Sequence, residues 1–285
     1  MSTSPHRILS LGLAALAVAA IAAPAKASNS IDLYYTYWQG ANWAPESWGD
    51  AGAFTAVIQP GSTLSQASVI ANYSPVSLFT EPDNTTAFET FCVETQVDFS
   101  PPGPYSFSTG LTTQQSPAFG TTGLGYLTAG AAWLYQQFAT GQFAVGTPDA
   151  ALIDPSNNIY NNSNDAGAIQ NAIWELLGED PSVTNSGYGA PSQTTAVYNL
   201  ALAHFGNSLT NAEAQVTSAS EYGVQVIELY SGSNPSSYAQ DQLIYTGTPT
   251  PPHYITVPDS GTTVALLGMA LLPLVFFRRR SVFQS

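Results

Sequence analysis

The feature that most constrains this fold is the complete absence of lysine and arginine from residues 28–277. An average chain is about one-quarter charged, but this stretch keeps all 19 acidic residues of the protein and none of its Lys or Arg cations. Its carboxylates therefore cannot form ion pairs with Lys or Arg, so apolar burial, hydrogen bonds or a covalent link must stabilise the fold. Nucleic acid is excluded as an expected partner because nothing would neutralise its phosphates.

The first of two groups of basic residues marks an export signal. Arg7 precedes an apolar run over 8–23, and Ala25-Lys26-Ala27 follows it. Small residues at Ala25 and Ala27 form the pattern that signal peptidase cleaves. Residues 1–27 are therefore expected to be a cleavable signal helix, with signal peptidase as a processing partner.

The second basic group closes a three-part tail. Its parts are Val257-Pro258-Asp259-Ser260-Gly261, an apolar stretch over 264–277, and Arg278-Arg279-Arg280. An apolar helix of this length reaches only about 21 Å, short of the roughly 30 Å hydrocarbon core. We expect a hydrophobic tail helix that holds the chain transiently at the inner membrane, with the arginines on the cytoplasmic side as a basic stop.

This tail resembles the PEP-CTERM class of sorting signals, most closely its VPDSG variant. The resemblance covers residues 257–281 and implies recognition and processing by an exosortase-like enzyme. It also implies an exported protein of the cell surface, outer envelope or extracellular matrix.

Residues 28–247 are predicted to form one β-rich α+β domain with about three helices, followed by a proline-rich linker over 248–256. Runs of aromatic and β-branched residues between Gly, Ser and Pro clusters predict strands. Apolar spacing of three and four residues predicts helices, and the Pro- and Gly-rich stretch over 101–123 predicts a loop. The expected strands are 31–38, 54–59, 88–99, 224–230 and 242–245, and the expected helices are 124–138, 166–177 and 195–205.

Cys92 is the only cysteine, so no disulfide can form within the chain. Two interpretations stay open. The thiol is a small buried hydrophobe, or it is a reactive group with a specific partner.

Two motifs favour the reactive thiol. Phe91-Cys92-Val93-Glu94 and Gln170-Asn171-Ala172-Ile173-Trp174 together resemble the strand and helix motifs of the thioester domains of Gram-positive surface adhesins. The resemblance implies that the Cys92 thiol attacks the Gln170 carboxamide, that ammonia leaves, and that an amine-bearing surface ligand later reacts with the thioester. We expect Trp174, one turn after Gln170, to shield the bond, and the N-terminus of the helix to favour the thiolate.

The missing lysines fit this chemistry, because a protein with an electrophilic bond benefits from having no amine of its own. The missing arginines are not explained in this way, since guanidinium is a poor nucleophile. The alternative function is a non-covalent structural protein of an exopolysaccharide matrix, in which Cys92 is merely buried.

Enzymatic activity, cofactors and metals are not expected. The loop Asp154–Asp165 has the length of a calcium loop but carries Ile159 where glycine is needed. Cys92 and His204 lack the signature of a cysteine hydrolase. Glu94 and Asp98 have the spacing of neighbours on a solvated sheet face.

Overall fold

The computed structural model describes residues 29–35, 53–81, 84–95, 97, 103–113, 123–143, 163–179, 191–231 and 237–247. The predicted signal peptide, linker and sorting tail lie outside these residues. Within them, no helix has the length and apolar character needed to cross a membrane.

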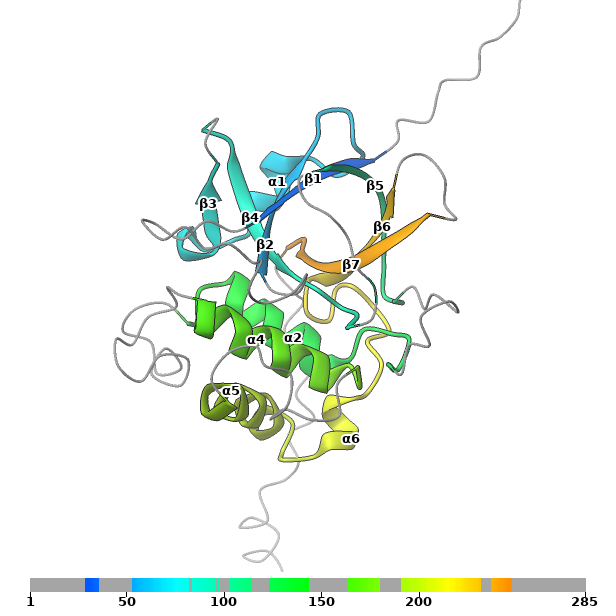
Figure 1. The fold of residues 1–285 in the computed structure, drawn as a ribbon. Coiled ribbons are helices and arrows are strands. Elements are labelled where there is room, and N and C mark those ends of the chain that lie inside the picture. Colours follow the sequence, from blue (N-terminus) through cyan, green and yellow to red (C-terminus); the bar gives the residue numbers. More distant parts are fainter. Residues whose placement is uncertain are drawn as a thin grey trace, which may run out of the picture.

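A seven-stranded antiparallel sheet forms the upper half of the domain (Figure 1). Its spatial order is β3-β4-β2-β1-β5-β6-β7, so the first strand lies in the middle and the last at an edge. The strands are β1 (Ser30–Tyr35), β2 (Ala53–Ile58), β3 (Leu78–Thr80), β4 (Thr86–Phe91), β5 (Gly103–Gly110), β6 (Val224–Ser231) and β7 (Tyr238–Tyr245).

The sheet curls until its last strand meets the end of β4. Cys92, directly after β4, forms an antiparallel bridge with Gln242 of β7. Beside it, the backbone N–H of Val93 donates to the carbonyl of Asp241 over 2.9 Å. Strands β4, β2, β1, β5, β6 and β7 thus form a nearly closed barrel, which protects backbone groups that an open edge would expose.

Helices α2, α4, α5 and α6 lie below the curled sheet, whereas the short helix α1 lies beside its strands (Figure 1). Helix α2 packs against β6 and β7, α4 packs against α2 and β2, and α5 covers α4. Helix α2 begins after Thr128, whose hydroxyl accepts from the Ala131 N–H, as expected of an N-cap. The helices are α1 (Gln66–Ile70), α2 (Ala129–Ala139), α4 (Ser163–Leu176), α5 (Pro191–His204) and α6 (Leu209–Ala212), with a 3-10 turn, η2 (Pro75–Ser77).

Aromatic side chains join the helical layer to the sheet. The ring of Phe91 packs edge-on against those of Phe138 and Tyr135 in α2. The Tyr135 hydroxyl donates to the Glu89 carbonyl over 2.8 Å and lies 2.8 Å from the Tyr73 hydroxyl. The hydroxyls of Tyr73 and Tyr135 therefore both have hydrogen-bond partners, as buried polar groups require.

The predicted α+β class is confirmed, and the described residues contain five α-helices where about three were expected. The three longest, α2, α4 and α5, correspond to the predicted ones. The predicted loop over 101–123 is wrong at 103–110, because that segment is β5. The predicted strand over 88–99 is too long, since β4 ends at Phe91, where Cys92 joins the bridge to β7.

Candidate functional site

Cys92 lies where three elements meet: the end of β4, the edge strand β7 and helix α4. Its side chain is 0% exposed. The bridge to Gln242 fixes its main chain against β7. The strand therefore presents the only thiol of the chain to the interior.

Gln170 reaches the same point from α4. Its Oε1 accepts from the Cys92 N–H over 2.8 Å, and its Nε2 donates to the Cys92 carbonyl over 2.7 Å. The carboxamide is 0% exposed because α4 is enclosed by the sheet, α2 and α5. The structure thus brings together Cys92 and Gln170, which lie 78 positions apart in the chain.

The thiol itself faces two glutamines of β7. Cys92 Sγ donates to Gln240 Oε1 over 2.9 Å, and Gln242 Nε2 donates to Cys92 Sγ over 3.3 Å. Sequence reasoning missed both residues. The signal that could have found them is Gln240-Asp241-Gln242, three consecutive polar residues in a strand that is buried from Ala239 to Tyr245.

Glu94 adds a buried carboxyl group beside the thiol strand. Its Oε2 accepts from the Asp241 N–H over 2.9 Å, whereas its Oε1 is buried without a hydrogen-bond partner. Burial raises the pKa of Glu94 to about 8, and the charges of Glu179 and Glu228 add to the effect while the Asp241 N–H opposes it. The expected solvated face is therefore wrong for Glu94, and Asp98 lies outside the described residues.

The two aromatic residues of the motifs are both buried. Phe91 belongs to the core beneath β4, against α2. Trp174 follows Gln170 by one turn of α4, and its shielding role stays a prediction. The expected help from the helix N-terminus is wrong, because α4 begins at Ser163. Gln170 therefore lies about 10 Å along the axis, and a helix dipole acts only within its first turn.

Two sites that the sequence does not favour, a calcium loop over 154–165 and a Cys92–His204 pair, fall partly within the described residues. His204, at the end of α5, stacks on Trp133 with ring centroids 4.4 Å apart, and burial lowers its pKa. Asp165 is buried in the first turn of α4, and the rest of the calcium-length loop up to residue 162 lies outside the described part. Within that part, no cluster of His, Cys, Asp or Glu could hold a metal ion.

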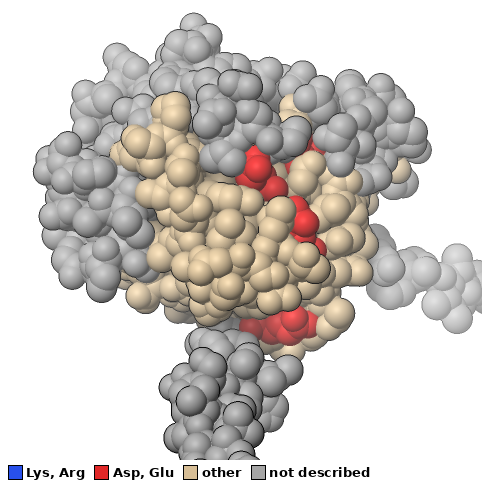
Figure 2. All heavy atoms as spheres, turned by 90° about the horizontal axis from the view of Figure 1, so that it is seen from below, with Lys and Arg blue, Asp and Glu red and all other residues tan. Residues whose placement is uncertain are grey.

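Figure 2 shows one face of the molecule, on which acidic side chains lie among uncharged ones. All five basic residues of the chain fall outside the described residues, so the described surface carries no Lys or Arg. Such an acidic surface attracts partners that carry positive charge.

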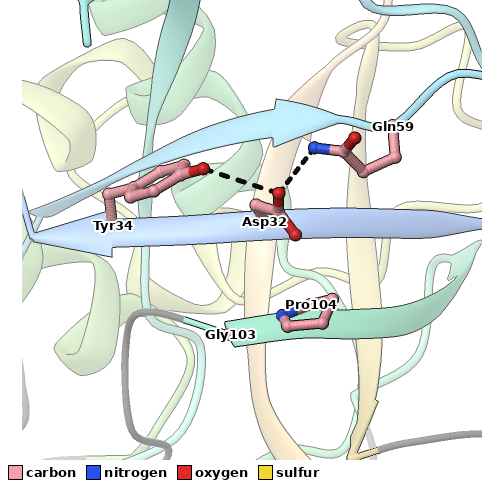
Figure 3. Close-up of a pocket in the computed structure, with 5 residues that line it drawn as sticks. All are labelled: Asp32, Tyr34, Gln59, Gly103 and Pro104. Carbon is pink, nitrogen blue, oxygen red and sulfur yellow. Dashed lines mark hydrogen bonds between the residues drawn. The ribbon is translucent and has the colours of Figure 1, made fainter. Parts of the chain in front are cut away.

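An open hollow lies on the outer face of β1, β2 and β5, with a volume of about 370 Å³. Figure 3 shows the Gln59 carboxamide and the Tyr34 hydroxyl pointing at the Asp32 carboxylate, with Pro104 beside them. Gln59 Nε2 donates to Asp32 Oδ2 over 2.6 Å, and the Tyr34 hydroxyl donates to the same oxygen over 3.5 Å. Burial raises the pKa of Asp32, and the Tyr34 hydrogen bond opposes that rise.

Comparison with known proteins assigns the tail. Residues 256–281 match the VPDSG-CTERM motif, which agrees with the sorting signal predicted over 257–281. No curated protein and no solved structure matches the chain. The motif is a sorting signal of exported proteins, so this chain is exported to the cell surface and sorted by an exosortase-type system.

Proposed function

We propose that this exported protein forms an internal thioester between Cys92 and Gln170 and uses it to attach covalently to amines on a surface or matrix ligand. The observation that carries the proposal is the pair of hydrogen bonds, 2.8 and 2.7 Å long, between the Gln170 carboxamide and the Cys92 main chain. They hold the electrophile against the residue that bears the nucleophile. Such prior orientation is a large part of what an intramolecular reaction requires.

In the proposed reaction, Cys92 Sγ attacks Gln170 Cδ. The C–N bond breaks, the thiol proton leaves with the nitrogen, and ammonia departs. The proposed attack needs a rotation about the Cys92 χ1 angle that takes the sulfur from Gln240 Oε1 to Gln170 Cδ and keeps it within reach of Gln242 Nε2. An external amine later attacks the same carbon, forms an amide, and returns the proton to sulfur.

Two further properties support the proposal. The complete burial of Cys92 and Gln170 would keep water from hydrolysing the bond. The lack of lysine in residues 28–277 would prevent the domain from consuming its own electrophile.

The test is the intact mass of the purified mature protein. Thioester formation should lower the mass by about 17 Da relative to the sequence. Methylamine should then add to the protein and free the thiol. Peptide mapping of that product should place methylamide at position 170.

Three variants make the test specific. Cys92→Ala and Gln170→Glu should have full mass, whereas Gln225→Ala on β6 should keep the mass loss because it lies away from the thiol. A full-mass wild-type protein would overturn the proposal. So would methylamide at position 240, since Gln240 Oε1 is the group 2.9 Å from the sulfur.

A second candidate function is non-covalent binding of exopolysaccharide, with Cys92 inert. The hollow of Asp32, Tyr34, Gln59 and Pro104 favours it, because an oriented carboxylate, an amide and an aromatic ring are the groups that bind sugar hydroxyls and ring faces. Cosedimentation with the matrix polysaccharide should be weakened by Asp32→Ala and Tyr34→Ala. Cys92→Ala, in contrast, should leave it unchanged.

A further inference from the structure

We propose that Gln240 and Gln242 of β7 are positioning residues for the Cys92 thiol: Gln240 holds its proton and Gln242 stabilises negative charge on the sulfur when the thioester forms or is cleaved. This inference rests on the proposed function and names two residues that its two motifs do not contain. Both come from the last strand of the domain, far along the chain from Cys92.

Hydrogen bonds fix the orientation of both carboxamides. Gln240 Nε2 donates to the Glu94 carbonyl, so its Oε1 must be the atom that faces Cys92 Sγ, 2.9 Å away. Gln242 Nε2 donates to the Gln240 carbonyl over 3.4 Å and to Cys92 Sγ over 3.3 Å. Because carbonyl oxygens only accept, neither amide can be flipped without losing a bond.

The second observation is an unused acceptor beside the sulfur. Gln242 Oε1 is buried and has no hydrogen-bond partner, in a side chain that is 0% exposed. An unsatisfied buried acceptor is costly, so its presence calls for an explanation. A neutral amine that attacks the thioester carries an N–H group, and so does the ammonia that leaves when the thioester forms. Gln242 Oε1 would accept a hydrogen bond from either.

The chemistry assigns a task to each contact. During aminolysis the C–S bond breaks and its electron pair goes to the sulfur, which becomes a thiolate until it takes up the proton that the amine loses. The Gln242 N–H donates to that sulfur, and a donor aimed at developing charge lowers the barrier. After protonation, Gln240 Oε1 accepts the S–H.

The experiment compares Gln240→Met and Gln242→Met with Gln225→Met, which removes a carboxamide on β6 that donates to Thr246 Oγ1 instead. Mass spectrometry follows the reaction with methylamine. Loss of one hydrogen bond to a charged sulfur should slow Gln242→Met roughly tenfold or more. If the substitution only loosened the packing around the site, the thioester would be more exposed and would react faster with methylamine. If Gln242→Met does not fold, Gln242→Glu tests the same contact in a side chain of the same shape.

A spectroscopic readout needs no thioester. Because Cys92 is the only cysteine, the Raman S–H stretching band reports this thiol alone. In the Gln170→Glu background, Gln240→Met should shift the band towards that of a free thiol, and Gln225→Met should not. An unchanged band together with an unchanged methylamine rate would overturn the inference. A full-mass wild-type protein would instead overturn the proposed function.

Discussion

Glu94 illustrates, at the scale of one residue, how a domain without Lys or Arg accommodates an acidic side chain. Burial raises the pKa of Glu94 from an ordinary 4.5 to about 8. Between these values the folded state keeps a proton that the unfolded chain releases. The contribution of Glu94 to the free energy of unfolding therefore falls as the pH rises from about 4.5 to about 8 and is level above that range.

Glu94→Gln should remove this dependence, because a carboxamide does not titrate. Urea unfolding at pH 5 and pH 8 should show a smaller loss of stability at pH 8 for Glu94→Gln than for the wild type. Glu213→Gln, at the end of α6, serves as the control and should keep the wild-type loss. Equal losses in all three proteins would contradict the predicted role of Glu94.

The burial of both residues of the proposed thioester predicts that its rate of reaction depends on the size of the amine. Because Cys92 and Gln170 are 0% exposed, an amine has to enter through a local opening of the site. Methylamine should react faster than a lysine-containing peptide at the same concentration of free amine. Equal rates, measured by the gain in mass with time, would mean that the bond is not enclosed.

At the scale of elements, close packing between helices limits the size of the residue at position 130 of α2. A Cβ on Gly130 would lie 2.8 Å from Leu176 Cδ2 in α4 and 3.0 Å from the Ala212 carbonyl oxygen in α6. Glycine in a helix normally costs about 0.5–1 kcal/mol relative to alanine. At this position the absence of Cβ is what allows α2 to approach both neighbours.

Gly130→Ala should therefore destabilise the domain by about 1–3 kcal/mol, against the trend of helix propensity. Asn199→Ala, at an exposed position of α5, should stay within about 0.5 kcal/mol of the wild type. Urea unfolding of the two variants measures the difference. A stabilised Gly130→Ala protein would show that α4 and α6 move aside freely.

Local sequence patterns were sufficient to predict some elements. They failed where contacts with neighbouring elements determine the structure. Helix α4 was predictable, because Ala166, Ile169 and Ile173 repeat at helical spacing and Gly178 ends it with a φ of +71°. Strand β5 was not, because its Pro, Ser and Gly residues resemble a loop and only pairing with β1 and β6 makes it a strand. Cys92 and Gln170 were found through motifs. Gln240 and Gln242 were not, because the closure of β7 onto β4 brings them to the thiol.

At the scale of the whole molecule, the described charges repel one another. The described residues hold acidic side chains and no Lys or Arg, so added salt should screen repulsion and break no ion pairs with those residues. The melting temperature should rise as NaCl increases from about 20 to 150 mM, a range over which the Debye length falls markedly. Near pH 4, where many carboxylates are protonated, the same addition should raise it less. A melting temperature that falls with salt would contradict this prediction.

The position of β7 near the end of the domain limits the distance between the domain and the sorting motif. Strand β7 ends at Tyr245 and the sorting motif begins at residue 256, so residues 246–255 are all that connect them. Even fully extended, a connection of this length spans at most about 40 Å. A tail held in the membrane, as the sequence predicts, would keep the proposed thioester within that distance of the bilayer, and cutting the tail would enlarge the volume that the domain can search.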